Sequence, residues 1–319
     1  MSPLQRIDID ALKASVSLAD VVGRRVKLRR VGRELVGLCP FHDERTPSFG
    51  VNDDKGMFHC FGCGANGDVV RFVMQSEGLS FLDAARWLGA GEWPAVDPVT
   101  RQAAVVADSA ERLAKIADAK ALWASAIGTP STPAEYYLRH RGIVMQAPWS
   151  IRYASTWFWK DYETGECSAN RPAMICAVQD VAGQVVGVQR VFIDPHGRGK
   201  FPMSNPKRSL GRIIGCALRL GPPATDHVIV CEGPEDGLTL SQCLPAVPVW
   251  VAMGTSVMPL LELPDSVRVV TLAGDNNAPG RAAVDAAAAA FTGKGLEVRT
   301  MFPDAAFADF NDELRNIRK

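Results

Sequence analysis

The sequence predicts a multidomain protein of the α+β and α/β class, ending in an α/β domain with a mainly parallel sheet. The length of 319 residues is sufficient for two or three domains, each with its own hydrophobic core. After the Pro-Pro pair at 222–223, strand-like and helix-like segments alternate, which is typical of an α/β domain. Nearer the N-terminus, two close Cys/His pairs indicate a small domain stabilised by a metal ion.

Composition excludes several classes of protein. Hydrophobic residues make up 47% and charged residues 22% of the chain, as in soluble globular proteins. No apolar run approaches the ~20 residues that span a bilayer, and the N-terminus lacks the apolar core of a signal peptide. We therefore expect a cytoplasmic protein with no membrane partner. In that reducing compartment, clustered cysteines are more suited to binding metal than to forming disulfides.

The net charge is zero, but the charges are segregated along the chain. Residues 24–33 carry six Lys/Arg and no acid. Residues 139–219 carry twelve Lys/Arg against five Asp/Glu, whereas residues 220–319 carry seven against thirteen. Ordinary solvated surface explains any single short run, but an asymmetry over whole domains favours a polyanion partner together with a cation site.

Four residues have the spacing of a zinc ribbon. Cys39-x2-His42 and Cys60-x2-Cys63 are separated by seventeen residues, so each pair can occupy a tight turn and together they supply four N/S ligands. We expect one structural Zn²⁺ with no open coordination position, which leaves His59 outside the site. The alternative is two incidental cysteine pairs in a reduced core, and the specific spacing disfavours it.

The first 130 residues are predicted to contain helices around one β-rich segment. Apolar residues recur at helical spacing in the helices, alternate with polar residues in the strand segment, and give way to Gly and Pro in the linker. In chain order we expect a helix over 7–22, a strand or hairpin over 26–38 with its turn at 31–33, helices over 68–74 and 80–88, a linker over 89–100 and a helix over 102–127.

The remainder is predicted to hold a small α+β part followed by the α/β domain. Gly142 favours the end of a helix, and residues 180–183 favour a turn between two strands. The expected elements are a helix over 136–143, strands over 174–178 and 184–193, and then alternating strands (228–231, 249–253, 267–273, 297–301) and helices (237–243, 281–291).

Acidic residues follow the apolar runs of the α/β domain. Glu232, Asp275 and Asp309 each come after such a run, with Asp236 and Asp312 close behind. Since the carboxyl ends of parallel strands meet at one sheet edge, these carboxylates would converge and repel one another without a divalent cation. The sequence therefore predicts a magnesium or manganese site suited to phosphate chemistry. The alternative is that they are turn and helix-cap carboxylates.

Three stretches resemble one family, the DnaG-type primases, in the smaller form carried by phages and mobile elements. Residues 38–49 and 58–65 resemble its zinc-binding domain. More loosely, residues 183–190 and 199–206 resemble its basic catalytic subdomain. The third stretch is similar to a Toprim domain and has matching residues at Glu232-Gly233, Asp236, Gly254-Thr255, Asp275-x-Asn277 and Gly280.

The resemblance implies a division of the chain and an activity. The segments are a zinc-ribbon DNA-binding domain at 1–92, a linker and helix at 93–130, a basic α+β subdomain of the catalytic core at 131–221, and a Toprim domain at 222–319. The implied enzyme is a DNA-directed RNA polymerase of the primase type. It would make short RNA primers on single-stranded DNA from nucleoside triphosphates by metal-dependent nucleotidyl transfer, in the replication of a phage, plasmid or other mobile element.

The resemblance also implies roles for individual residues. Glu232, Asp275 and Asp309 are the candidate catalytic carboxylates, and Glu232 is alternatively a general base. The candidate ligands of magnesium or manganese are Glu232, Asp236, Asp275, Asn277, Asp309 and Asp312. The candidate nucleotide or template contacts are Arg190, Lys200, Lys207 and Arg208. Lys207 and Arg208 are equally consistent with plain surface charge.

In this family the zinc-binding domain engages the template. The basic run at 24–33, with Phe49, Phe58 and Phe61, would offer phosphate contacts and stacking surfaces to a single strand. Packing over the zinc core is an equally good account of the phenylalanines. For Trp157 and Trp159, base stacking and burial are likewise both consistent with the sequence.

Two departures from the family pattern matter. Asn277 stands where a second aspartate is usual, so one metal would be held more weakly. The chain also ends soon after the Toprim region, which puts recruitment by a replicative helicase in doubt; a single-strand-binding protein is a further candidate partner. The alternative functions are a catalytically weakened accessory protein that binds nucleic acid and a Toprim nuclease. A topoisomerase is disfavoured because the chain has no room for a domain with a nucleophilic tyrosine.

Overall fold

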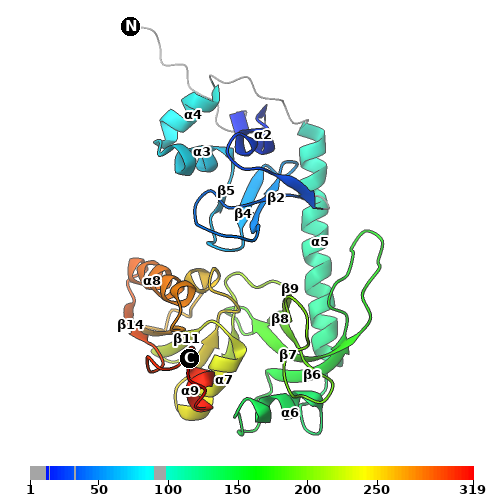
Figure 1. The fold of residues 1–319 in the computed structure, drawn as a ribbon, viewed down its shortest axis with the longest axis vertical. Helices are drawn as coiled ribbons and strands as arrows, with labels where there is room; N and C mark the ends of the chain where they lie inside the picture. Colours follow the sequence, from blue (N-terminus) through cyan, green and yellow to red (C-terminus); the bar gives the residue numbers. More distant parts are fainter. Residues whose placement is uncertain (1–11, 14, 32–33, 90–97) are drawn as a thin grey trace. The chain divides into compact units, whose positions relative to one another are not determined.

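The computed structural model describes residues 12–13, 15–31, 34–89 and 98–319. The chain divides into two compact units, Met1–Ala110 and Glu111–Lys319, which are described separately below. Both units combine helices and strands (Figure 1), which confirms the predicted multidomain α+β and α/β class.

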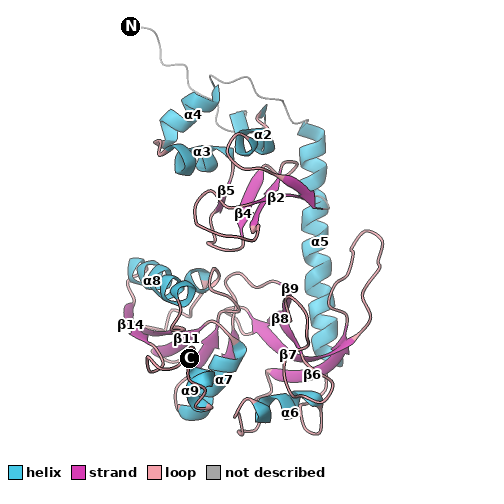
Figure 2. Ribbon diagram, viewed as in Figure 1, coloured by secondary structure: helices cyan, strands magenta, loops and turns pink. Residues whose placement is uncertain are grey.

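The N-terminal unit is built on a five-stranded antiparallel sheet. Its strands, in both spatial and chain order, are β1 (Arg29–Val31), β2 (Glu34–Gly37), β3 (Phe49–Asn52), β4 (Met57–Cys60) and β5 (Asn66–Gly67). The sheet shares one apolar core with helices α2 (Leu18–Gly23), α3 (Val69–Glu77) and α4 (Phe81–Gly89) (Figure 2). Because β2 and β4 both run antiparallel to β3, they point in the same direction and end at the same edge. That edge carries the two Cys/His pairs.

Four phenylalanine rings fill the centre of this core. Phe41, Phe49, Phe58 and Phe72 have ring centroids 5.2–6.2 Å apart. Phe49 and Phe58 are almost completely buried, whereas Phe61 is 70% exposed. Packing is therefore the role of Phe49 and Phe58, and only Phe61 of the three candidate stacking rings is open to a ligand.

Several predicted elements lie partly outside the described residues. These are residues 7–11 and 14 of the expected helix 7–22, residues 32–33 of the hairpin turn and residues 90–97 of the linker. Ser17 caps α2 by accepting a hydrogen bond from the Asp20 N–H. The long helix α5 (Pro98–Ser125) begins inside the predicted linker, since proline is favoured at the first position of a helix. Among the described residues, no helix combines the length and apolarity that crossing a membrane requires.

The C-terminal unit begins with the end of α5 and a four-stranded antiparallel sheet. The elements are α6 (Pro133–His140), β6 (Ile151–Thr156), β7 (Arg171–Gln179), β8 (Val185–Phe192) and β9 (Lys207–Gly211). Alternation of side chains gives the sheet two apolar faces. Ile175, Val188 and Phe192 pack with α5, while Met174 and Val191 face the core shared with the second sheet.

The second sheet is mainly parallel, as the sequence predicts. Its strands lie in the order β10-β12-β11-β13-β14, and only β10 is antiparallel to its neighbour. These strands are β10 (Leu218–Leu220), β11 (His227–Cys231), β12 (Val249–Val251), β13 (Val269–Ala273) and β14 (Glu297–Met301). Helix α7 (Pro234–Cys243) covers one face and α8 (Ala278–Gly293) the other, and the short α9 (Phe310–Leu314) packs beside α7 (Figure 1).

The aromatic core predicts how the N-terminal unit responds to truncation. Replacing buried Phe58 by alanine should destabilise this unit by about 3–5 kcal/mol, because the lost ring contacts leave a cavity. Phe61→Ala is the matched control and should change the unfolding free energy by less than about 0.5 kcal/mol, because its ring is exposed. Chemical denaturation followed by amide hydrogen exchange would measure both. Equal losses for the two variants would contradict the assignment of the core.

Candidate functional site

Cys39, His42, Cys60 and Cys63 come together where β2 and β4 end. One ligand atom from each lies within 4.8 Å of all the others. The Cys39 and Cys63 sulfurs are 3.8 Å apart, and the Cys60 sulfur is 3.8 Å from Nδ1 of His42. A zinc–sulfur bond of about 2.3 Å places two sulfurs of a tetrahedral site about 3.8 Å apart. The donor set and its dimensions therefore fit a zinc ion with four protein ligands.

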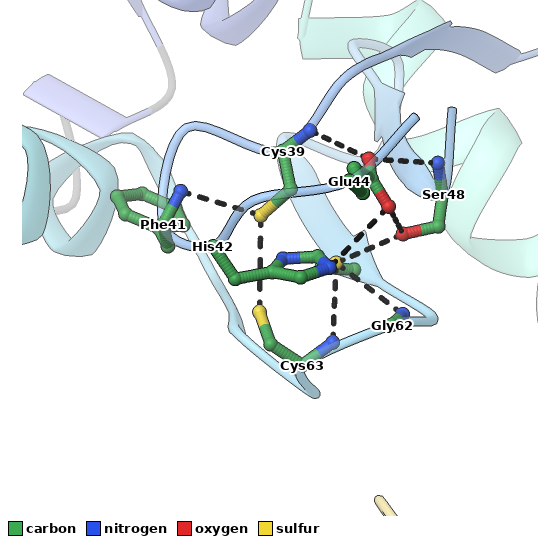
Figure 3. Close-up of polar contacts among 8 residues, drawn as sticks. Cys39, Phe41, His42, Glu44, Ser48, Gly62 and Cys63 are labelled. Carbon is green, nitrogen blue, oxygen red and sulfur yellow. Dashed lines mark hydrogen bonds and ion pairs between the residues drawn. The ribbon is translucent and has the colours of Figure 1, made fainter. Parts of the chain in front are cut away.

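Backbone N–H groups converge on the sulfurs (Figure 3). The N–H groups of Gly62 and Cys63 donate to Cys60 Sγ, each at 3.4 Å, and the Phe41 N–H donates to Cys39 Sγ at 3.4 Å. A Cβ added at Gly62 would approach the His42 ring to 2.6 Å, so the glycine permits this close turn. Such donors stabilise thiolates, the form of cysteine that binds metal.

Glu44 orients the histidine ligand from the opposite side (Figure 3). Its carboxylate lies 3.4 Å from Nε2 of His42, the ring nitrogen remote from the cysteines. The same carboxylate accepts the N–H groups of Cys39 and Ser48 at 2.7 and 3.1 Å. A carboxylate at this position holds the tautomer in which Nδ1 is free to bind a metal. Glu44 therefore links the histidine to the chain around Cys39.

A second group of ionisable residues lies at the carboxyl edge of the parallel sheet. β11 and β13 are paired neighbours up to their last residues, Cys231 and Ala273. Glu232 follows β11 and Asp275 follows β13, so both lie at the same edge of the sheet. Asp236 belongs to the first turn of α7, and Asp309 is the N-cap of α9. All four carboxylates line one cavity. The predicted convergence of acidic turns is thus present in the structure.

Local backbone contacts hold these side chains in place. Asp309 accepts the Asp312 N–H at 2.7 Å, and Asp236 accepts a backbone N–H of α9 at 3.0 Å. The start of α8 packs closely on the turn after β13. A Cβ added at Gly280 would come within 2.8 Å of the Asp275 carbonyl oxygen, so glycine is required for this approach.

Burial and mutual repulsion disfavour ionisation of these carboxylates. Burial, together with the charges of Asp309 and Asp275, raises the pKa of Asp236 to about 8. Burial and the charge of Asp275 also raise the pKa of Glu232, although Lys207 acts in the opposite direction. Burial and Asp309 raise the pKa of Asp275. A divalent cation in the cavity would reverse this effect, because it favours the ionised form of every carboxylate around it.

Positive side chains reach the same cavity from outside the parallel sheet. Lys200 lies between β8 and β9, Lys207 is the first residue of β9, and Arg141 follows α6. Among the described residues, no carboxylate oxygen lies within 4.0 Å of Lys207 Nζ, so Lys207 forms no ion pair there. The cavity therefore combines acids from one sheet with cations from the other half of the unit.

Glu235 differs from its acidic neighbours. Its side chain is only 6% exposed, and it accepts hydrogen bonds from Lys200 Nζ at 2.9 Å and from the Tyr137 hydroxyl at 2.8 Å. Burial alone would raise the pKa of Glu235, but the charges of Lys200 and Lys207 and these two hydrogen bonds hold it at about 2. Glu235 is therefore ionised at neutral pH even without a bound cation.

Asn277 and Asp312 were expected among the metal ligands, but neither lines the cavity. Asn277 is the N-cap of α8, and its side-chain oxygen accepts the Gly280 N–H at 2.7 Å. Asp312 lies in the first turn of α9. The side chain of Asn277 therefore caps a helix and also hydrogen-bonds the Asp275 carboxylate, and the roles of Asn277 and Asp312 as metal ligands stay predictions.

Arg190 and Arg208 were expected to contact nucleotide or template, but they lie on the other face of the antiparallel sheet. The two are direct cross-strand partners on β8 and β9. Arg190 is 3% exposed, donates to the Trp157 carbonyl at 2.7 Å and has its guanidinium 4.4 Å from the centre of the Trp157 ring. Strand alternation sends Lys207, which adjoins Arg208, to the face with the cavity.

Three residues at this site were not predicted as site residues. Glu235 lies in the same acidic turn as Glu232, and Asn311 lies in the acidic segment 309–312, so both had a local signal. Arg141 had none, because nothing around it in the sequence indicates an approach to the parallel sheet. The structure brings it there through a hydrogen bond from Nη1 to Asn311 Oδ1 at 3.3 Å.

Comparison with known families identifies three regions of the chain. Residues 4–92 match the DnaG zinc ribbon, described as a CHC2 zinc finger, and residues 227–317 match a Toprim domain. These two regions contain the two groups of candidate ligands. Residues 114–220 match a domain of unknown function (DUF7146), so the looser resemblance of this middle region to a primase subdomain stays a prediction.

Curated relatives match about a quarter of the chain. The DNA primase of Geobacillus stearothermophilus is 51% identical over 82 residues, which cover 26% of this chain and 14% of that protein. The DNA primase of Mycolicibacterium smegmatis is 54% identical over 82 residues, which cover 25% of this chain and 13% of that protein. The matched region thus spans only a small fraction of the length of these relatives.

Solved structures show weaker similarity over more of the chain. The zinc-binding and RNA polymerase domains of the Aquifex aeolicus primase are 20% identical, with a TM-score of 0.46 and coverage of 98% of this chain and 83% of that one. A DnaG primase catalytic domain bound to single-stranded DNA is 17% identical, with a TM-score of 0.44 and coverage of 65% and 76%. By sequence, the chain contains a CHC2 zinc ribbon of the DnaG type and a Toprim domain, and about a quarter of it is similar to curated DNA primases.

Proposed function

We propose that the chain synthesises short RNA primers on single-stranded DNA by metal-dependent nucleotidyl transfer, in the replication of a phage, plasmid or other mobile element. The observation that carries the proposal is one cavity in which Glu232, Asp236, Asp275 and Asp309 face Lys207 and Arg141. Joining nucleotides requires a negative site for divalent cations beside positive groups for the triphosphate. The relationship to DnaG-type primases agrees with this chemistry.

Within the cavity, we assign the four carboxylates to holding magnesium or manganese. A cation there would supply Lewis-acid stabilisation of the attacking and leaving oxygens. Lys207 would contact a phosphate, because it lines the cavity and forms no ion pair with any carboxylate of the described residues. Glu232 is the alternative acceptor for the proton of the attacking hydroxyl, since its carboxylate lines the same cavity.

The proposed division of labour follows the four segments predicted from the sequence. Segment 1–92 would bind the template, 93–130 would connect it to the core, and 131–221 and 222–319 would together form the catalytic part. The zinc ribbon would do no chemistry, because all four ligands are protein groups and no coordination position stays open. The exposed strand β1 and the exposed ring of Phe61 support contacts to a single strand.

The catalytic assignment predicts loss of primer synthesis in Glu232→Gln. Activity should fall by at least about 100-fold, because the substitution removes a metal-binding charge and a candidate base. The assay incubates single-stranded DNA with labelled ribonucleotides and magnesium or manganese, and resolves the products on a denaturing gel. Glu262→Gln is the matched control, since Glu262 pairs with Arg212 and does not line the cavity.

Other outcomes of that assay have definite meanings. DNA binding without product under either metal would rule out the primase and favour an accessory protein that binds nucleic acid. Cleavage of the DNA strand would favour a Toprim nuclease. Unchanged synthesis in Glu232→Gln would remove this carboxylate from the catalytic set.

The opposite faces of β9 predict different effects for two adjacent cations. Lys207→Met should raise the KM for nucleoside triphosphates roughly tenfold, the effect of losing one charge-assisted hydrogen bond. Arg208→Met should leave that KM within about twofold, because its side chain lies on the face away from the cavity. Steady-state primer synthesis at varied nucleotide concentration measures both. A larger effect at Arg208 than at Lys207 would contradict the assignment.

The zinc assignment predicts stoichiometric metal in the purified protein. The chain should contain one zinc per molecule by elemental analysis, and Cys60→Ser should lose it together with the folding cooperativity of the N-terminal unit. Cys167→Ser is the control, since Cys167 is exposed and lies outside the ligand set. Full zinc content in Cys60→Ser would contradict the site.

A further inference from the structure

Lys200 and Glu235 form an ion pair inside the wall of the proposed catalytic cavity. Lys200 Nζ lies 2.9 Å from Glu235 Oε1, and the side chains are 27% and 6% exposed. Both residues line the cavity together with Glu232, Asp236, Asp275 and Asp309. An ion pair this close to an unpaired acidic cluster affects the charge that the cluster presents to a cation.

Glu235 is fixed from the side away from the cavity. The Tyr137 hydroxyl donates to Glu235 Oε1 at 2.8 Å, and Tyr137 is completely buried. The same hydroxyl accepts from Arg141 Nε at 3.3 Å. Arg141 is in turn tied to α9, since its carbonyl accepts from Asn311 Nδ2 at 2.8 Å. Helices α6, α7 and α9 therefore hold the Glu235 carboxylate in one position.

The charge balance explains what this arrangement achieves. An uncompensated ammonium group in an acidic cavity reduces its negative potential, and so weakens the attraction of the carboxylates for a divalent cation. Lys200 lines the cavity but is engaged by Glu235, which the hydroxyl of Tyr137 holds in the wall. The positive charge of Lys200 is thus compensated outside the group of four carboxylates.

We propose that Glu235 is a positioning residue that holds the ammonium group of Lys200 against the cavity wall and so keeps Glu232, Asp236, Asp275 and Asp309 open to a divalent cation. The inference rests on the proposed function, since it assigns the four carboxylates to cation binding. It adds a residue whose effect is exerted through Lys200 and not through contact with substrate.

The test is a titration of the zinc-loaded protein with Mn²⁺, in which electron paramagnetic resonance measures the free ion. Glu235→Gln should raise the Kd for Mn²⁺ roughly tenfold, because the positive charge of Lys200 is then uncompensated beside the four carboxylates. Adding Lys200→Met to Glu235→Gln should restore the Kd to within about threefold of the wild-type value. Restoration separates charge compensation from structural damage, since damage by Glu235→Gln would persist in the double variant.

Two control variants complete the design. Tyr137→Phe removes a buried hydrogen bond but keeps the ion pair, so it should lower the melting temperature and leave the Kd within about threefold. Glu262→Gln removes an acidic residue outside the cavity and should leave the Kd unchanged. If Glu235→Gln alone does not fold, the Kd values of the double variant and of Tyr137→Phe are the test. Neither variant leaves the charge of Lys200 uncompensated, so both Kd values should stay within about threefold of the wild-type value.

The outcomes distinguish this inference from the proposed function. An unchanged Kd in Glu235→Gln, or a double variant as weak as the single one, would overturn the positioning role. If Asp275→Asn binds Mn²⁺ with the same Kd as the wild-type protein, the assignment of the cavity as a metal site is overturned instead.

Discussion

Repulsion among buried carboxylates is the constraint on which the C-terminal unit depends. The parallel pairing of β11 and β13 ends both strands at one level, so Glu232 and Asp275 are forced to the same edge. Helices α7 and α9 add Asp236 and Asp309. A protein gains little stability from assembling such a group, because burial and neighbouring charges raise the pKa values of Glu232, Asp236 and Asp275 and so disfavour their ionised forms. The arrangement makes sense as a site that a multivalent cation completes.

The zinc ribbon also brings close together groups that repel one another when ionised, but it stabilises them differently. Its donors are also gathered at the ends of strands, but N–H groups and the carboxylate of Glu44 surround them, and the four protein ligands close the shell. The cavity of the parallel sheet has no closed shell, and its counter-charges, Lys207 and Arg141, come from elsewhere in the fold. One site is therefore suited to stability and the other to exchange with ligands.

Sequence reasoning succeeded where the signal was local. The zinc ligands have fixed spacing, and the carboxylates of the cavity follow recognisable apolar strands. It failed where placement depends on packing between distant segments. Arg141 approaches the cavity through Asn311, 170 residues away along the chain. Lys207 and Arg208 are neighbours of like charge, and only the register of β9 against β8 decides which of them faces the carboxylates.

Arg141 and Lys207 lie outside the parallel sheet, and this affects when the cavity is complete during folding. The carboxylates belong to the last hundred residues, whereas the cations belong to segments that precede Pro222. A chain in which only the parallel sheet had folded would present the carboxylates without Lys207 and Arg141, the proposed phosphate contacts. The cavity that combines acids with cations therefore forms only when the two sheets of the unit pack together.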